Sequence, residues 1–291
     1  MQLVSPSIFL RLGRVSNLPT VWTNTLAGVA VAGAPLDATL VPLCIGTSLF
    51  YIGGMYLNDA FDSAIDARER PERPIPSGQI SRATVLALGF GMLAIGAMLC
   101  LWTGVTHTGT SLVALAASCL ALAGAIVVYD INHKENPLSP LIMGLCRSLV
   151  YLVAAVSVGG QVGLPLGTTM LGTLAYLIGL TYVAKQENLN RIQNLWPLAF
   201  LGLPVVQVLL QMPSWSVLGV LLSFVLWTFY ALSAVLNPER RSIPQAVTRF
   251  IAGIALLDAV WAMHAGESQL ALLCALCFLA TRATQRIIPG T

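Results

Sequence analysis

The residues of this chain that could carry out chemistry are concentrated in the short segment from Asn58 to Asp66. Three of the twelve acidic residues, Asp59, Asp62 and Asp66, fall within these positions. Their spacing, with Asn58 four residues before Asp62, places the side-chain oxygens along one face of a helix over roughly 12 Å. Carboxylates this close repel one another unless a cation lies among them. A hard ion such as Mg²⁺ binds such oxygens and leaves coordination positions free for phosphate.

Basic residues follow the acidic segment directly. Arg68, Arg70 and Arg73 lie within its next seven positions, and Arg73 opens the run Arg-Pro-Ile-Pro-Ser-Gly at 73–78. A guanidinium group binds phosphate oxygens through two parallel hydrogen bonds. Carboxylates, a divalent cation and guanidinium groups in one place predict a binding site for a diphosphate.

The elements that must position these residues are membrane helices. Hydrophobic residues make up 56% of the chain, and the mean hydropathy is +0.80, far above that of soluble proteins. No Asp, Glu, Lys or Arg occurs in residues 83–129, 148–184 or 192–238. Each stretch is about twice the ~20 residues that cross a bilayer, so each predicts a helical hairpin. The fold class is therefore an all-α polytopic membrane bundle of nine to ten helices, in a single domain over residues 1–291.

The placement of Lys and Arg favours ten spans over nine. We predict spans centred near residues 25, 49, 93, 119, 149, 175, 204, 226, 255 and 276. The loops after odd-numbered spans carry no Lys or Arg, whereas both termini and the loops after even-numbered spans do. The positive-inside rule then places both termini and the acidic segment on the cytoplasmic side, and we expect the cell inner membrane. A nine-span chain would leave Arg282 and Arg286 on the wrong side. The net charge of +3 reports this orientation and indicates no nucleic-acid partner.

Two motifs together resemble the UbiA family of intramembrane prenyltransferases. The first is the acidic segment with residues 73–78, placed after the second span. The second follows span four and runs from Tyr129 to Lys134, with Pro140 and Gly144 beyond it and with His133 and Lys134 at the basic positions. The resemblance covers the first nine spans, and a tenth exceeds the usual number.

The resemblance implies an enzyme that transfers a prenyl group from a polyprenyl diphosphate to an unidentified, lipophilic acceptor within the lipid bilayer. It implies that Mg²⁺ is bound by Asn58, Asp59 and Asp62, with Asp66 outermost. Asp62 and Lys134 would then be catalytic, and Arg73, Tyr129 and Lys134 would bind the substrate. The simpler alternative is a solvated helix end that is acidic by chance.

The second acidic motif of the family is altered in this chain. After span six, Gln186 and Asn190 occupy the positions where the family has two aspartates. Neutral amides supply no charge, but Lys185 could neutralise a diphosphate directly and Glu187 could provide a displaced carboxylate. We therefore assign Lys185, Gln186 and Asn190 to substrate binding, with an ordinary polar loop as the alternative.

Polar residues also occur inside three spans. Arg147 and Asp258 lie at similar depths, so they could pair with each other, or Arg147 could bind the diphosphate as a catalytic residue. Arg147 is not a general position of the family and suggests a divergent, EboC-like branch. Asn17, Thr20 and Asn24 share a face of the first span. We assign Asn17 and Asn24 to substrate binding, and hydrogen bonding between helices is the alternative.

Two other functions compete with the prenyltransferase. A non-catalytic membrane protein that binds or moves an isoprenoid lipid is favoured by the altered second motif. An ion-coupled transporter would have paired acidic residues near the midplane and inverted repeats, whereas the acidic residues of this chain gather at one edge.

Overall fold

The computed structural model is built from helices, and no strand occurs within the residues that it describes, which are 6–134, 136–186, 194–237, 241–288 and 290. The elements, with η for a 3-10 helix, are α1 (Pro6–Leu12), η1 (Val15–Asn17), α2 (Leu18–Val31), η2 (Ala38–Leu40), α3 (Val41–Glu69), α4 (Arg82–Thr106), α5 (Leu112–Asn132), α6 (Ser139–Ser157), α7 (Leu164–Ala184), η4 (Trp196–Gly202), α8 (Leu203–Leu210), α9 (Trp215–Leu236), α10 (Ile243–His264) and α11 (Ser268–Thr284). Every predicted span centre falls within one of these helices.

The all-α membrane bundle is confirmed. Seven of the described helices are long and apolar enough to cross a membrane, from α3 to α7 and then α9 and α10. The continuous stretch of η4 and α8 is a shorter apolar helix, as is α11. The number of helices agrees roughly with the predicted nine to ten spans.

Proline and serine mark where the helices begin. Proline stands at the first or second position of α2, α3, α6, α7 and α10, where its missing N–H costs no hydrogen bond. Ser81, Ser111 and Ser214 precede α4, α5 and α9, and each side chain accepts a hydrogen bond from a backbone N–H of the first turn. These residues therefore mark where each helix of the apolar sequence begins.

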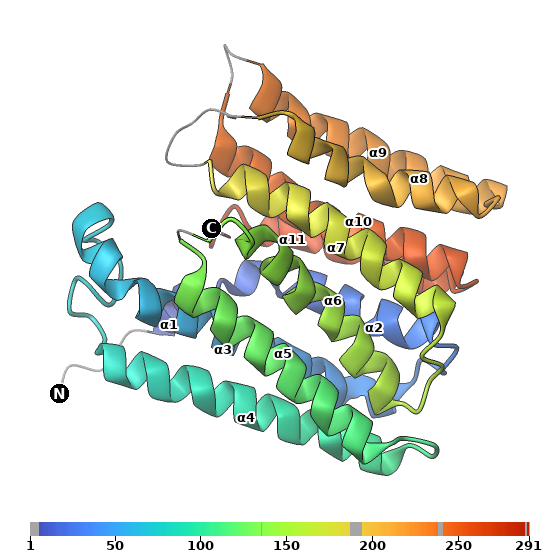
Figure 1. The fold of residues 1–291 in the computed structure, drawn as a ribbon, viewed down its shortest axis with the longest axis horizontal. Helices are drawn as coiled ribbons and strands as arrows, with labels where there is room; N and C mark the ends of the chain where they lie inside the picture. Colours follow the sequence, from blue (N-terminus) through green and yellow to red (C-terminus); the bar gives the residue numbers. More distant parts are fainter. Residues whose placement is uncertain (1–5, 135, 187–193, 238–240, 289, 291) are drawn as a thin grey trace.

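The helices run back and forth, so that alternate connections lie at the same end of the bundle (Figure 1). The ends of α3, α5, α7 and α9 lie at the left of the view, together with α1 and the end of α11. The connections from α4 to α5, from α6 to α7 and from α10 to α11 lie at the right. The ends that carry the basic residues therefore share one end of the molecule.

Close packing of glycines holds α3 against α4. A Cβ on Gly96 would lie 2.7 Å from the carbonyl oxygen of Gly46, and one on Gly53 would lie 2.9 Å from that of Gly89. These distances are too short for any side chain, so the two backbones approach each other only because both positions of each pair are glycine. The contact fixes the helix that carries the acidic segment.

The length of α3 places that segment at the membrane edge. Its 29 residues span about 43 Å at 1.5 Å per residue, against about 30 Å for the hydrocarbon core of a bilayer. The last turns of α3, from Asn58 onwards, therefore lie near or beyond the end of the hydrocarbon.

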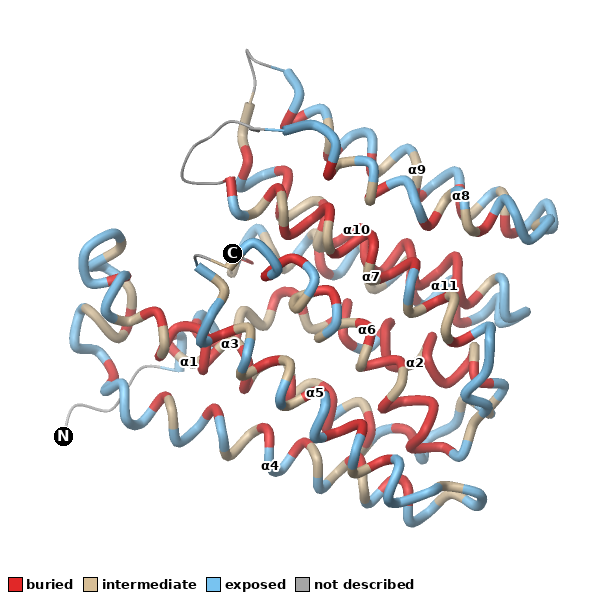
Figure 2. The backbone as a smooth tube through the Cα atoms, viewed as in Figure 1, coloured by how far each residue is buried: buried red, intermediate tan, exposed pale blue. Residues whose placement is uncertain are grey.

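Burial separates an inner and an outer set of helix faces (Figure 2). Large apolar side chains on the outer faces of α4 and α9 are exposed, among them Trp102 and Phe229. Exposed apolar faces of this kind suit contact with lipid tails. By contrast α10 is buried along most of its length and packs against α2, α7, α9 and α11.

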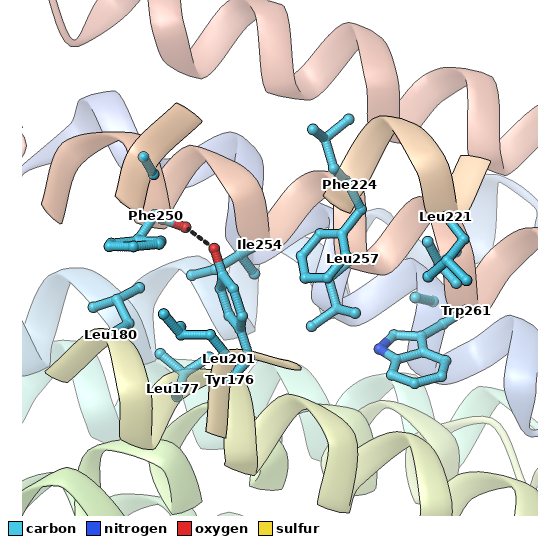
Figure 3. Packing of buried hydrophobic residues seen from close by; sticks show 14 of the residues in the cluster. Tyr176, Leu177, Leu180, Leu201, Leu221, Phe224, Phe250, Ile254, Leu257 and Trp261 are labelled. Atoms are coloured by element: carbon cyan, nitrogen blue, oxygen red, sulfur yellow. Dashed lines mark hydrogen bonds between the residues drawn. The ribbon is translucent and has the colours of Figure 1, made fainter. Parts of the chain in front are cut away.

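The core between α7 and α10 packs aromatic side chains among leucine and isoleucine (Figure 3). The buried Tyr176 hydroxyl donates a hydrogen bond to the carbonyl of Phe250 at 2.9 Å, and the Tyr176 ring packs against Phe224 with centroids 5.4 Å apart. Leu180 and Ile254 belong to the same cluster and also line the cavity described below. This packing therefore forms one wall of the cavity.

Candidate active site

A cavity of about 420 Å³ opens among α2, α3, α5, α6, α7 and α10. Predicted site residues that line it are Asn17, Asn58, Asp62, Arg73, Tyr129, Lys134, Arg147 and Lys185. Asn24, Asp59, Asp66 and Gln186 do not line it, and Asn190 and Glu187 lie outside the described residues. Apolar side chains such as Phe50, Leu122 and Ile126 cover other parts of its wall. The cavity therefore has a polar end, at the ends of α3 and α5, and an interior in which apolar side chains predominate.

Asp62 joins the two sequence motifs. Its Oδ2 lies 3.2 Å from the Nζ of Lys134 and 3.4 Å from the Nε2 of His133. The ring of His133 stacks on Tyr129 with centroids 4.9 Å apart, which orients it towards α3. The carboxylate is buried while the ammonium group is more exposed, so the pair sits at the opening of the cavity with positive charge outward.

The other two aspartates of the segment face arginines. The Nη1 of Arg73 lies 2.8 Å from Asp66 and 3.3 Å from Asp59, and the Nη2 of Arg14 lies 3.3 Å from the same Asp59 oxygen. Arg14 has a φ of +42°, in the left-handed region that L-residues seldom adopt. The hydroxyl of Tyr51 donates a hydrogen bond to its carbonyl at 3.3 Å and so helps to hold it. The four predicted metal ligands are thus divided into two groups.

A third polar residue, Asp130, lines the cavity together with Asn58 and Asp62, and the sequence analysis assigned it no role. The Nδ2 of Asn58 donates to the Oδ1 of Asp130 at 3.2 Å. The Oδ2 of Asp130 is buried and has no hydrogen-bond partner among the described residues. An unpaired carboxylate oxygen in a buried place is costly. Asp130 lies within the segment from Tyr129 to Lys134, directly after the predicted fourth span, and its acidic side chain within that motif was the available signal.

These oxygens fit a magnesium ion. Asn58, Asp62 and Asp130 all line the polar end of the cavity, and amide and carboxylate oxygens are the ligands of Mg²⁺. The described residues contain no group of three or more His, Cys, Asp or Glu side chains that could hold a metal ion by themselves. An open arrangement is what Mg²⁺ needs where phosphate oxygens and water complete its coordination.

Lys185 contacts the loop that follows the Tyr129–Lys134 motif. Its Nζ donates to the carbonyl of Asn136 at 2.8 Å and to the Oγ of Ser139 at 2.9 Å. The side chain therefore ties the end of α7 to the start of α6, beside the loop that carries His133 and Lys134. Only a small part of this side chain is buried, and that burial lowers its pKa. Gln186 is buried, and its Oε1 has no partner among the described residues.

The polar residues of the first span divide between the cavity and the interior. Asn17 lines the cavity and donates to the hydroxyl of Tyr51 and to the carbonyl of Gly290. Asn24 is fully buried and bonds to Arg147 and Asp258, so hydrogen bonding between helices, the alternative considered for this face, describes it better than cavity lining. The described contacts contain no direct ion pair between Arg147 and Asp258, because Asn24 lies between them.

Comparisons with known proteins agree on the family. The sequence profile described as the UbiA prenyltransferase family matches residues 18–194. The digeranylgeranylglyceryl phosphate synthase of Methanopyrus kandleri is 29% identical over 206 residues, which cover 69% of this chain and 68% of that protein. The enzyme of the same name from Methanothrix thermoacetophila is 35% identical over 136 residues, covering 45% and 46% of the two chains.

Solved structures show the same fold. A structure described as giving insights into the biosynthesis of digeranylgeranylglyceryl phosphate synthase in membranes matches with a TM-score of 0.62 and 19% identity, over 89% of this chain and 97% of that one. A UbiA homologue from Archaeoglobus fulgidus, bound to DMAPP and Mg²⁺, matches with a TM-score of 0.50 and 14% identity, over 96% and 99%.

Proposed function

Because the chain belongs to the UbiA prenyltransferase family and is a multi-pass integral membrane protein, we propose that it transfers a prenyl group from a polyprenyl diphosphate to a lipophilic acceptor with the help of Mg²⁺. The reaction takes place at the end of the bundle that carries both termini. The excess of Lys and Arg at that end supports the proposal that it faces the cytoplasm, with the protein in the cell inner membrane.

Asn58, Asp62 and Asp130 would hold the metal, since all three line the polar end of the cavity and Asn58 contacts Asp130 there. A bound Mg²⁺ neutralises the negative charge on phosphate oxygens and so makes pyrophosphate a better leaving group. Asp59 and Asp66 act differently. They orient the guanidinium groups of Arg14 and Arg73, both of which line the cavity, towards the diphosphate.

Lys134, His133 and Arg73 bind the diphosphate of the donor. Lys134 and His133 surround Asp62 on the side of α5, and Arg73 approaches from the loop after α3. Cationic groups fixed before the reaction stabilise the charge that develops on the departing pyrophosphate. Lys134 is therefore the protein's own catalytic cation, and Asp62 fixes its position. Tyr129 supports this arrangement by stacking on His133.

The apolar wall receives the hydrocarbon tail. Phe50, Leu122 and Ile126 from α3 and α5 face Leu177 and Ile254 from α7 and α10 across the cavity. Cleavage of the C–O bond to pyrophosphate would form the allylic cation where the polar end meets this wall. The apolar side chains would keep the cation from water until the acceptor attacks it and loses a proton.

The observation that carries the proposal is the position of the Asp62, His133 and Lys134 cluster at the opening of an apolar cavity. Purified protein incubated with radiolabelled prenyl diphosphates of several lengths and a membrane extract should yield a labelled lipid, and EDTA should prevent its formation. Asp62→Asn is the matched variant, because it keeps the side-chain volume and removes the charge. Failure to label any lipid, with each donor length tested, would refute the transferase.

A non-catalytic protein that binds or moves an isoprenoid lipid is the second candidate. It is favoured by Gln186, a neutral residue where the family has an aspartate. The same incubation separates the two candidates, because a binding protein would retain the labelled diphosphate unchanged.

A further inference from the structure

A second polar cluster lies in the interior of the bundle, apart from the carboxylates of α3. Its centre is Asp258 of α10, which is fully buried. The carboxylate accepts hydrogen bonds from the hydroxyls of Thr23 and Tyr151 and from the amide of Asn24. Acidic side chains inside membrane spans are costly and are seldom kept without a functional or structural partner. The partner here is reached through Asn24.

Asn24 connects Asp258 to Arg147. Its Nδ2 lies 2.8 and 2.9 Å from the two Asp258 oxygens, and its Oδ1 accepts a hydrogen bond from the Nη1 of Arg147 at 2.8 Å. The carboxylate can only accept hydrogen bonds, so it draws the NH₂ of the amide towards itself. The amide oxygen must then point to the guanidinium group. Asp258 therefore determines which atom of Asn24 faces Arg147.

Arg147 presents its charge to the cavity. It lines the cavity wall above the ring of Tyr51, at 5.4 Å from the ring centroid. Its other hydrogen bonds go to the carbonyl and the hydroxyl of Thr20. Within the described residues no carboxylate lies within 4.0 Å of it, whereas Arg14, Arg73 and Lys134 each contact an aspartate of α3. Arg147 is thus a guanidinium group held by neutral atoms and free to bind an anion.

This guanidinium lies deeper than the site of the diphosphate. On α6, Arg147 is eight residues beyond Ser139, which is about 12 Å along the helix axis. On α3, Tyr51 precedes Asn58 and Asp62 by seven and eleven residues, or roughly 10 and 16 Å. An anionic group bound at Arg147 would therefore occupy a different part of the cavity from one bound at Asp62.

We propose that Arg147 forms a second anion site in the interior of the cavity, which takes a phosphate group of a lipid substrate. Asp258 and Asn24 are positioning residues for this site, since they hold the guanidinium without neutralising it by direct contact. The phosphate belongs either to the acceptor or to the donor. The assignment of the site to a lipid substrate rests on the proposed prenyl transfer, whereas anion binding itself does not.

The test uses three probes with the same hydrocarbon chain and the full-length protein in nanodiscs. Farnesyl monophosphate, with EDTA present, measures binding at the anion site. Farnesol, also with EDTA, is the uncharged reference. Farnesyl thiodiphosphate with Mg²⁺ reports the donor site. We expect Arg147→Gln to weaken farnesyl monophosphate binding about tenfold, as for the loss of one hydrogen bond to a charged group, and to leave farnesol binding unchanged.

The positioning role is tested by Asp258→Asn and Asn24→Ala, either of which suffices if the other fails to fold. Each should cause a loss of farnesyl monophosphate affinity similar to that of Arg147→Gln, and the double variant with Arg147→Gln should lose no more. Thr173→Val is the matched control. It removes a hydrogen bond to Tyr151 on the other side of the cluster, so a purely structural effect would appear in it too, while a positioning effect would not.

The outcomes separate the sources of the phosphate. A loss confined to the monophosphate indicates a phosphorylated acceptor, and a parallel loss of thiodiphosphate affinity indicates the donor. Unchanged affinity for both probes in Arg147→Gln would overturn the anion site, and fully additive effects of Asp258→Asn would overturn the positioning role. If wild-type protein bound the monophosphate through Arg147 but transferred no prenyl group, the proposed function alone would fail.

Discussion

The Nζ of Lys134 lies 3.2 Å from the Oδ2 of Asp62, so that an ion pair connects the residues just after α5 to the last turns of α3. The pair brings a metal-binding carboxylate and a diphosphate-binding cation to the same side of the cavity. Each partner therefore affects the site of the other, and substitutions at either position should be read together.

We predict that Asp62→Ala abolishes the Mg²⁺-dependent binding of a prenyl diphosphate. Loss of a metal ligand costs several kcal/mol of charge stabilisation, so the affinity should fall by more than about 100-fold. Isothermal titration of a prenyl thiodiphosphate, with and without Mg²⁺, measures the effect. Asp37→Ala, at an exposed position of the opposite end, is the control and should bind normally. Equal affinities for wild type and Asp62→Ala would disprove the site.

Lys185 and Lys134 should differ in how they affect the protein. Because Lys185 ties α7 to the loop before α6, Lys185→Ala should lower the melting temperature by about 2 °C or more and weaken diphosphate binding as a consequence. Lys134→Ala should weaken binding and leave the melting temperature nearly unchanged. Thermal unfolding in detergent, combined with the same titration, distinguishes the two roles. A stable Lys185→Ala protein with lost affinity would mean that Lys185 binds the diphosphate directly.

The contact between α3 and α4 provides a test of the fold. Gly96→Val would force a side chain onto the carbonyl of Gly46, where only 2.7 Å is available, and should destabilise the protein by about 1–3 kcal/mol. Gly91→Val on the same helix is the matched control, because no atom lies within 4 Å of its Cβ. Chemical unfolding of both variants measures the difference. Similar stability would show that the helices are not held this closely.

The orientation in the membrane has its own test. Single cysteines at position 70 and position 285 should react with a membrane-impermeant reagent from the cytoplasmic side. A cysteine at position 107, in the connection between α4 and α5 at the opposite end of the bundle, should react from the other side of the membrane. Labelling of positions 70 and 285 from different sides would contradict the arrangement of the helices in Figure 1.

Much of the fold could be predicted because membrane helices follow from local sequence. The apolar stretches and the placement of Lys and Arg located every span centre within a helix, and the spacing of Asn58 and Asp62 indicated one helical face. The pairing of Asp59 and Asp66 with Arg14 and Arg73 could not be predicted in the same way. It depends on the loop after α3 folding back and on the left-handed turn at Arg14, and neither has a periodic signature.

The interior of the site was predicted less completely. The depths of Arg147 and Asp258 suggested that they could pair, yet the tertiary packing inserts Asn24 between them. Asp130 was passed over because its role depends on the distance between α5 and α3, which no spacing within one helix reveals. The roles of Asn24 and Asp130 therefore depend on contacts between helices, which the sequence alone did not predict.

The extra length of α3 has a consequence for the fate of the two products. The helix carries the acidic segment to the edge of the hydrocarbon core, so pyrophosphate released there enters water without crossing the bilayer interior. The prenylated product keeps its tail among apolar helices whose outer faces meet the bilayer. On the proposed reaction, one long helix thus separates a water-soluble product from a lipid-soluble one, and the partition of each into its own phase opposes the reverse reaction.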